Sequence, residues 1–193
     1  MRSTIRNTTI VGAIAVLAAV TGAARTTTPD SMTLSTESRL WLEGTSTARS
    51  FKCTAGKIDV LVASKPEATP SNLVQSASLV VPVSSLDCKN KTMNEHMMKA
   101  LKAGANPKIS WKLDSYRVTG TTVFMSGLLT IAGRTNPIEI TGTGSADSKG
   151  VIRMTGSKLF KMSEYGVKPP SLMLGTMKVR DPVTVSFDLV LNP

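Results

Sequence analysis

Few side chains in this sequence could act as a nucleophile, a general base or a metal ligand. The candidates are two cysteines, Cys53 and Cys88, and a single histidine, His96. Nucleophilic catalysis needs a base held beside the nucleophile, and two thiols with one imidazole fall short of a zinc site. The chain has no G-x-S-x-G, H-E-x-x-H or phosphate-loop motif, and its acidic residues are scattered singly. The sequence therefore predicts no enzyme, no metal site and no cofactor, and we expect His96 to be an ordinary helix residue.

The first residues have the layout of a secretory signal peptide, over residues 1–24. Two arginines give a positive start, residues 10–20 form an uninterrupted apolar run, and small residues follow up to Ala24. That run is too short to span a bilayer, which needs roughly 20 residues, and no cysteine follows it to accept a lipid. We expect cleavage near Ala24 and export of a soluble protein, in which residues 25–32 form a disordered leader.

The expected export affects the oxidation state that we predict for the two cysteines. An even number of cysteines in an exported chain favours a disulfide, so we predict a bond between Cys53 and Cys88. Two buried free thiols are the alternative. Closing a loop of this length would stabilise the fold by roughly 3–4 kcal/mol on the chain-entropy model.

Beyond the leader, the dominant pattern is an alternation of apolar and polar residues with a period of two, which is typical of half-buried strands. The pattern is clearest in residues 109–113, 123–131 and 183–191. Turn signals rich in Gly, Pro, Asn and Ser separate these runs. The sequence predicts an all-β domain over residues 33–193, with about eight strands in an antiparallel barrel or a sandwich. Periodicity does not choose between these two architectures.

One helix is predicted over residues 92–103. Thr92 and Glu95 have the spacing of a capping box, and Gly104 is suited to follow the last turn. Lysines near the predicted end lie favourably in the field of the helix dipole. The apolar residues that share one face are Met93, Met97, Ala100 and Leu101.

The chain is basic, with a formal net charge of +10. Such a charge could favour anionic lipid, pyrophosphate or nucleic acid. Nucleic acid is the weakest of these partners, because the chain is exported and lacks aromatic residues among its basic ones. From Lys89 to Lys112, six lysines stand against one acidic residue, Glu95. This segment would suit an anionic head group if it rimmed a cavity, but we favour a solvated face.

Several stretches together resemble the YceI-like family, exported proteins related to polyisoprenoid-binding proteins. Trp111 stands where the family often has Phe. The matching stretches span residues 37–191, and their order and spacing make the resemblance specific. They are the opening strand pair at 41–47 (WLEGTST), the helix leading to NPxIxF at 93–111, the hairpin at 129–138 (LTIAGRTNPI), and the segments at 162–170 and 179–183 before and within the last strand.

The resemblance implies a single lipocalin-like antiparallel β-barrel with a helix nearby and an elongated apolar cavity. It also implies a periplasmic carrier or sequestering protein that binds a long isoprenoid or another amphiphilic lipid, without catalysis. Inward-facing residues would line the cavity, although alternation alone defines two faces without labelling them. The residues that we expect to line it are Ile109, Trp111, Leu113, Met125, Leu129, Ile131, Val185, Phe187 and Leu189.

A rival hypothesis is a non-catalytic structural, stress-related or interaction protein whose barrel core is fully packed. It predicts that a polar residue at Leu129 or Phe187 lowers stability without any binding to lose. The resemblance also leaves room for a homodimer and for transient contact with a membrane surface. Nucleic acid is not among the expected partners.

Overall fold

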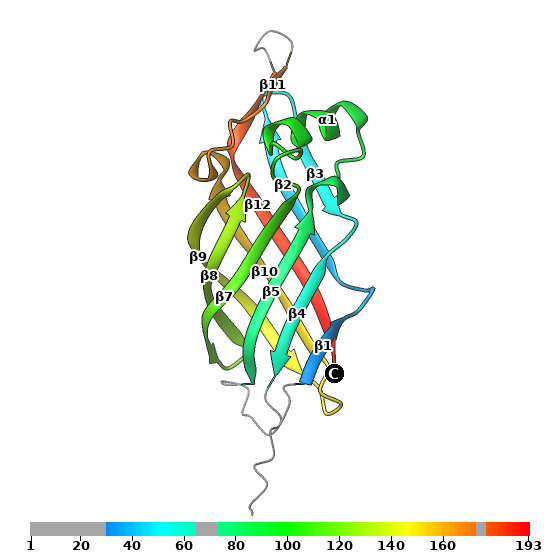
Figure 1. The fold of residues 1–193 in the computed structure, drawn as a ribbon, viewed down its shortest axis with the longest axis vertical. Helices are drawn as coiled ribbons and strands as arrows, with labels where there is room; N and C mark the ends of the chain where they lie inside the picture. Colours follow the sequence, from blue (N-terminus) through cyan, green and yellow to red (C-terminus); the bar gives the residue numbers. More distant parts are fainter. Residues whose placement is uncertain (1–29, 65–72, 173–176) are drawn as a thin grey trace, which may run out of the picture.

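The structure is a computed structural model that describes residues 30–64, 73–172 and 177–193. The predicted signal peptide lies outside the described residues and stays a prediction. The described chain forms an antiparallel β-barrel with one α-helix, α1 (Lys91–Ala100), at the end shown uppermost in Figure 1. The barrel that the resemblance implied is thereby confirmed, and the sandwich is not the architecture.

Eight strands close the barrel, and each pairs antiparallel with its neighbours. In their order around the ring they are β1 (Asp30–Leu34), β4 (Asp59–Ser64), β5 (Val74–Pro82), β7 (Lys108–Thr119), β8 (Thr122–Ile131), β9 (Arg134–Ala146), β10 (Ile152–Lys161) and β12 (Met177–Asn192). The ring closes where β12 pairs with β1, through Leu34 opposite Leu191.

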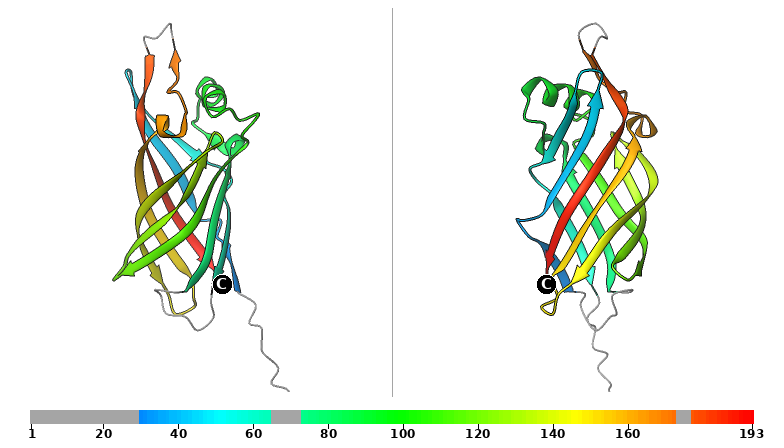
Figure 2. Two further views of the ribbon diagram at one scale, coloured as in Figure 1. Left: turned by 60° about the vertical axis from the view of Figure 1, so that its left-hand side comes forward. Right: turned by 180° about the vertical axis from the view of Figure 1, so that it is seen from behind.

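The remaining elements enlarge the upper half of the barrel. β2 (Arg39–Ser46) pairs with β12, and β3 (Ser50–Ala55) and β6 (Leu86–Asp87) follow it at the edge of the sheet. β11 (Ser171–Leu172) pairs with the start of β12. The 3-10 turns are η1 (Val83–Ser85) and η2 (Met162–Tyr165). Seen from behind, β12 runs between β10 and β2 (Figure 2).

The helix begins earlier than predicted. Its N-cap is Asn90, whose side-chain oxygen accepts a hydrogen bond from the backbone N–H of Met93 at 2.9 Å. Thr92 therefore lies inside the first turn, and the predicted capping box with Glu95 is wrong. Asn is at least as good an N-cap as Thr, which accounts for the earlier start.

The helix also ends earlier than predicted. It stops at Ala100, and Lys102 turns the chain with a left-handed φ of 52°, so that Gly104 is not the residue that ends it. A second left-handed lysine, Lys89 with a φ of 57°, precedes the helix. Such conformations cost free energy for residues other than Gly, and here they allow sharp turns into and out of α1.

The prediction of a disordered leader over residues 25–32 is wrong for its last three residues. Residues 30–32 belong to β1, because Met32 is only 7% exposed and packs against Val62, Ile152 and Leu191. The barrel domain therefore begins before residue 33, whereas residues 25–29 lie outside the described part of the chain. These four side chains form one of three buried clusters, the packed core at the lower end of the barrel, near the C-terminus in Figure 1, whereas the other two lie toward the end that carries α1.

A β-bulge interrupts the alternation of β7 between Leu113 and Ser115. Before the bulge, Trp111 lies opposite Leu129 of β8, whereas after it Tyr116 lies opposite Met125. Directly opposed residues of an antiparallel pair share one face. The inward positions of β7 therefore change from odd to even numbers at the bulge.

Candidate ligand-binding cavity

The upper half of the barrel encloses an apolar cavity of about 470 Å³. Small-molecule pockets commonly measure roughly 300–1,000 Å³, so the space is large enough for a ligand. Strands β2, β3, β5, β7, β8, β9, β10 and β12 contribute to its wall, and α1 contributes Met93, Met97, Ala100 and Leu101. The apolar face predicted for the helix therefore does face the interior, even though the helix bounds were wrong.

Most of the residues predicted to line the cavity do so, and they come from β7, β8 and β12. The exception is Leu113, which lies opposite Gly127 of β8 beside the β-bulge and is absent from the lining. Contact between these residues and a ligand remains a prediction. The predicted residues found in the lining are Ile109, Trp111, Met125, Leu129, Ile131, Val185, Phe187 and Leu189.

Sequence reasoning missed the lining residues of the other strands. Among them are Leu40, Leu42, Phe51, Ile138, Ile140, Met154 and Phe160. Ile138 and Ile140 alternate with polar residues, so the signal that identified β8 could also have identified β9. In β2, the apolar run at residues 40–42 hides the alternation, and the inward residues are not evident from the sequence.

Aromatic side chains in the cavity wall lie against glycines. A Cβ atom at Gly127 would fall 2.7 Å from the indole Nε1 of Trp111, and one at Gly156 would fall 2.5 Å from the ring of Phe187. Because glycine has no side chain, each ring can lie close to the backbone of the neighbouring strand. The rings therefore do not need to project across the barrel, which helps to keep the interior open.

The Trp111 indole is held in this way without a hydrogen bond. Its Nε1 is buried and has no partner among the described residues, which is uncommon for a buried N–H group. Trp111 thus contributes apolar wall to the cavity at some cost in free energy. A smaller Phe at this position would have no N–H group to satisfy.

The polar side chains of the lining, apart from the tips of Trp and Tyr, are confined to two segments at the upper rim. The turn between β2 and β3 contributes Ser46 and Arg49, and the start of α1 contributes Asn90, Thr92 and His96. The cavity therefore has a polar rim at one end, whereas the other end is closed by the packed core.

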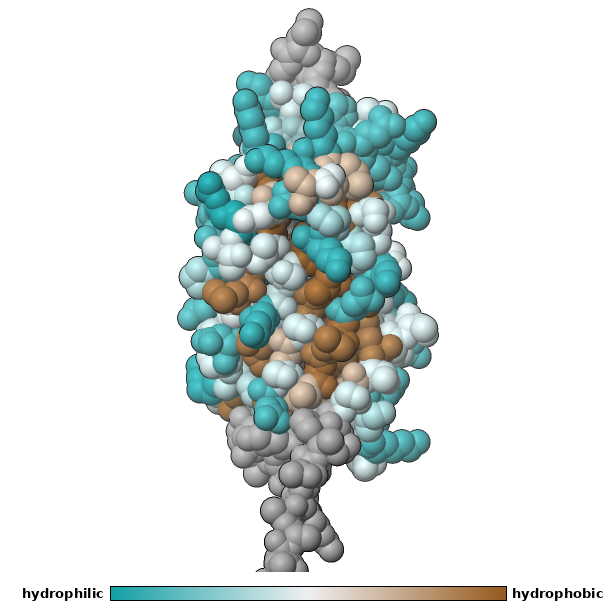
Figure 3. Space-filling view, viewed as in Figure 1, coloured by the Kyte–Doolittle hydropathy of each residue, from teal (hydrophilic) through white to brown (hydrophobic). Residues whose placement is uncertain are grey.

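The lysine-rich segment from Lys89 to Lys112 is a solvated face, as favoured from the sequence. All six of its lysines are exposed, and none of them lines the cavity. Figure 3 shows hydrophilic side chains over the upper end of the molecule and apolar ones lower on the strand wall. These lysines contribute to the general positive field around the rim rather than to the wall of the cavity.

The predicted disulfide between Cys53 and Cys88 is confirmed, and free thiols are not found in the described residues. It joins β3 to the segment that leads into α1, and both half-cystines are buried and line the cavity. The Cα atoms are 3.9 Å apart. The bond therefore fastens the start of the helix to the barrel wall at the rim.

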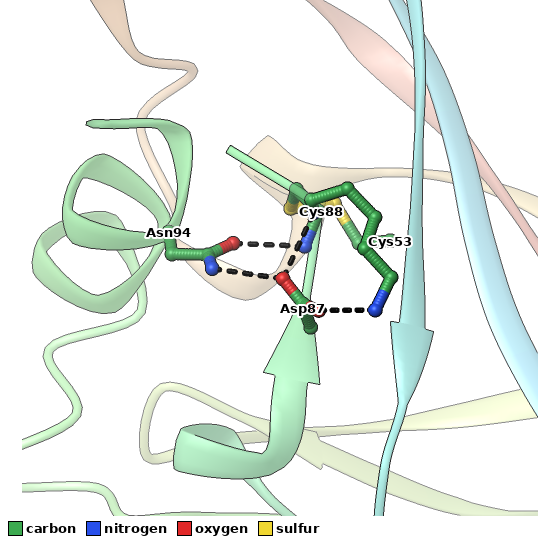
Figure 4. Close-up of polar contacts among 5 residues, drawn as sticks. Cys53, Asp87, Cys88 and Asn94 are labelled. Carbon is green, nitrogen blue, oxygen red and sulfur yellow. Dashed lines mark hydrogen bonds and ion pairs between the residues drawn. A yellow bond between two sulfur atoms is a disulfide. The ribbon is translucent and has the colours of Figure 1, made fainter. Parts of the chain in front are cut away.

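Hydrogen bonds reinforce the same attachment (Figure 4). The Asn94 side chain accepts from the Cys88 backbone N–H at 2.8 Å and donates to Asp87 Oδ1 at 3.0 Å. Asp87 also accepts from the Lys89 backbone N–H at 2.8 Å and pairs with Lys89 Nζ at 2.7 Å. Hydrogen bonds from the Lys89 side chain, then from Asn94 and the Lys89 backbone, hold the pKa of the Asp87 carboxyl well below its usual value.

The described residues contain neither a cluster of metal ligands nor a membrane-spanning helix. No three side chains of His, Cys, Asp or Glu in residues 30–64, 73–172 and 177–193 come together as metal ligands. In the same residues, no helix has the length and apolar character needed to cross a bilayer.

The structure is similar to several solved structures. BcnA of Burkholderia cenocepacia matches with a TM-score of 0.68 and 20% identity, over 80% of this chain and 96% of that chain. A polyisoprenoid-binding domain of Saccharophagus degradans, implicated in plant cell wall breakdown, matches with a TM-score of 0.63 and 15% identity, over 84% and 97%. The YceI protein of Campylobacter jejuni gives 0.61 and 16%, over 74% and 85%. Similarities at such low identity show a shared fold.

The sequence itself identifies the family. Among curated proteins, none matches the chain significantly. The sequence model of the YceI-like domain, however, matches residues 26–191, which is most of the chain and all of the barrel except its last residues. The expected resemblance is therefore confirmed, and this chain belongs to the YceI-like family.

Proposed function

We propose that this protein is a periplasmic carrier or sequestering protein that holds the apolar tail of an isoprenoid-type or other amphiphilic lipid in its barrel. The observation that carries the proposal is the apolar cavity of about 470 Å³, which is packed shut at one end and rimmed with polar side chains at the other. Removing a hydrocarbon tail from water contributes about 25 cal/mol per Å² of apolar surface. The cavity wall needs no other chemistry to retain such a tail.

The comparisons support the same proposal. A structural relative from Saccharophagus degradans is described as a polyisoprenoid-binding domain. The disulfide is consistent with the oxidising compartment that the predicted signal peptide would reach. We further propose that lipid enters and leaves during transient contact with a membrane surface, and that the protein is not an enzyme. A homodimer remains a hypothesis that extends this proposal.

The rival hypothesis of a fully packed barrel loses support from the cavity. Native protein interiors are close-packed, with few voids larger than a water molecule. An unfilled apolar space of about 470 Å³ would be costly in a protein whose barrel served only as a scaffold. A ligand that fills the space removes that cost.

Fluorescence of Trp111, which lines the cavity, offers a direct test. Trp41 is the other tryptophan, and its Nε1 donates to Glu43 outside the cavity, so a Trp41→Phe variant leaves Trp111 as the sole reporter. Retinol is an isoprenoid alcohol that absorbs at the wavelengths of tryptophan emission. We expect saturable quenching at one retinol per protein, reversed by the prenyl alcohol geranylgeraniol.

Neighbouring leucines of β8 provide a matched pair of variants in this background. Leu129→Asn places an amide in the cavity and should weaken retinol binding strongly, whereas Leu128→Asn alters a side chain that is 47% exposed and should leave binding unchanged. Absence of saturable quenching in correctly folded protein, together with no uptake of geranylgeraniol, would overturn the proposal. Loss of stability in Leu129→Asn with no binding to lose would instead support the packed-scaffold hypothesis.

A further inference from the structure

Resting on the proposed function, we infer that the rim of the cavity is a binding site for an anionic oxygen head group, a carboxylate or a phosphate, centred on Arg49. Charge is distributed unevenly in the lining of the cavity. Among the described residues that line the cavity, Arg49 is the only Lys, Arg, Asp or Glu. A cation in the lining, with no acidic residue among the other lining residues, favours ligands of negative charge.

Arg49 is placed by its turn but not neutralised by it. Its backbone N–H donates to Ser46 Oγ at 3.1 Å, and its carbonyl oxygen accepts from the Ser46 backbone N–H at 2.8 Å. Ion pairs found among the described residues do not include Arg49. The turn therefore fixes where the side chain begins and leaves the guanidinium available to a ligand.

The helix side of the rim supplies two further polar groups. Thr92 and His96 lie four residues apart, so they project from the same side of α1, and both line the cavity. Neither side chain has a hydrogen-bond partner among the described residues. By contrast, the side-chain oxygen of Asn90 is already engaged as the N-cap, and the Ser46 hydroxyl is engaged in the turn. Arg49, Thr92 and His96 are thus the polar groups left to meet a head group.

These groups match an oxyanion better than an alcohol. A guanidinium offers parallel N–H donors whose spacing fits two oxygens of a carboxylate or phosphate. Thr92 and His96 can each donate a further hydrogen bond. The start of α1 also presents the positive end of the helix dipole to this side of the rim. A hydroxyl head group would use only part of this set.

A head group at Arg49 would also determine the orientation of the lipid in the cavity. With the head group at Arg49, the tail runs past Met93 and Met97 of α1 into the apolar wall, toward Phe187 and Leu189 of β12. The six exposed lysines nearby raise the local concentration of anions but do not touch the cavity. If Arg49 contacts the head group, its removal should affect binding of anionic ligands more than removal of an exposed lysine. If only the general positive potential matters, removal of either cation should have a similar effect.

The test compares two probes with nearly the same tail, retinoate and retinol, by quenching of Trp111 in the Trp41→Phe background. We expect retinoate to bind more tightly than retinol by roughly threefold to tenfold at low salt, as one partly exposed charge-assisted contact would give. Arg49→Gln should abolish this preference. Lys91→Gln, which removes an exposed cation at the first residue of α1 that does not line the cavity, should preserve it.

A second pair of probes separates the two head-group sources. Geranylgeranyl phosphate and geranylgeraniol compete with retinol, and the pair with the larger Arg49-dependent preference identifies the head group as phosphate or carboxylate. Equal affinities within both pairs in the wild-type protein would overturn the inference, as would an equal loss of preference in Lys91→Gln and Arg49→Gln. Failure of all four probes to bind would instead overturn the proposed function.

Discussion

The two ends of the barrel share the same strands but fill their interiors differently. At the lower end, aliphatic side chains from β1, β4, β10 and β12 interlock into the packed core. At the upper end, the inward side chains include aromatic rings that lie against glycines, and an open cavity remains between the walls. β12 contributes to both, with Leu191 in the core and Leu189 in the cavity wall. The alternation that builds a barrel therefore does not decide whether the barrel is filled.

This difference in packing implies that the two ends of the barrel have different roles. Packed side chains contribute stability through burial and dispersion. Side chains that border a cavity lack some of these contacts until a ligand occupies it. We expect the lower end to hold the fold and the upper end to hold the ligand. Four substitution experiments test this comparison.

The largest expected effect comes from shortening leucines of β12 that lie two residues apart. Leu191→Ala should lower the free energy of unfolding by about 2–5 kcal/mol, because Leu191 is 6% exposed and the core around it cannot collapse fully. Leu189→Ala should cost clearly less, because that side chain already borders empty space. Urea unfolding of both variants measures the difference, and equal losses would contradict the division between the ends.

Removal of the disulfide should rank second. The Cys53→Ala, Cys88→Ala double variant should lose about 2–4 kcal/mol, since the bond closes a loop of sequence separation 35. Because the bond fastens α1 to β3, amide exchange in α1 should accelerate more than exchange in β4 or β10 at the lower end. Hydrogen exchange followed by mass spectrometry measures both regions. Unchanged protection of α1 would show that the disulfide does not secure the rim.

The glycines of the cavity wall give the third effect. In Gly156→Ala, the new Cβ would meet the Phe187 ring and push it toward the interior, which should lower stability by about 1–3 kcal/mol and retinol affinity by roughly tenfold. Gly104→Ala is the matched control, because nothing lies within 4 Å of its would-be Cβ. Retinol titration compares the two variants, and unaltered binding in Gly156→Ala would show that the ring position does not control the cavity.

The smallest effect concerns acid pH at the rim. The folded state lowers the pKa of Asp87, so its contribution to stability is fully present above the usual value of 3.8 and is lost as pH falls below it. Asp87→Asn should therefore accelerate amide exchange at Cys88 and Lys89 at neutral pH, with a difference from wild type that shrinks in acid. Titration of the Asp87 carboxyl by NMR should give a midpoint below 3.8, and a midpoint at or above it would contradict the network in Figure 4.

A control for this last experiment lies at the opposite end of the barrel. Asp147 caps the turn between β9 and β10 by accepting from the backbone N–H groups of Lys149 and Val151. Asp147→Asn should loosen that turn and leave exchange in α1 unchanged. Faster exchange in α1 would mean that the two ends are coupled, contrary to the comparison.

The parts of this structure that follow a local pattern could be predicted from the sequence. Alternation in β8 and β12 identified Leu129, Phe187 and their neighbours as one face, but it did not show whether that face was the inward one. The cysteine count and the predicted export were enough to predict the disulfide. The barrel also followed from the resemblance, whereas periodicity alone left a sandwich open.

What the sequence could not reveal depends on contacts between distant strands. The close approach of Trp111 to Gly127 requires the register of β7 against β8, and the bulge beside Leu113 appears only in that register. The lining of the cavity likewise includes Arg49 and His96, which come from separate segments of the chain. The capping error was local, since Asn90 and Thr92 are both acceptable caps and sequence alone did not rank them.

Native mass spectrometry of the protein purified from its own host tests the central claim most directly. We expect a fraction of the protein to carry one additional mass, which is released on unfolding and is identified as a lipid with a long apolar tail. Protein that shows only its own mass, and that takes up neither retinol nor geranylgeraniol, would contradict the claim that the upper half of the barrel is a lipid-binding cavity.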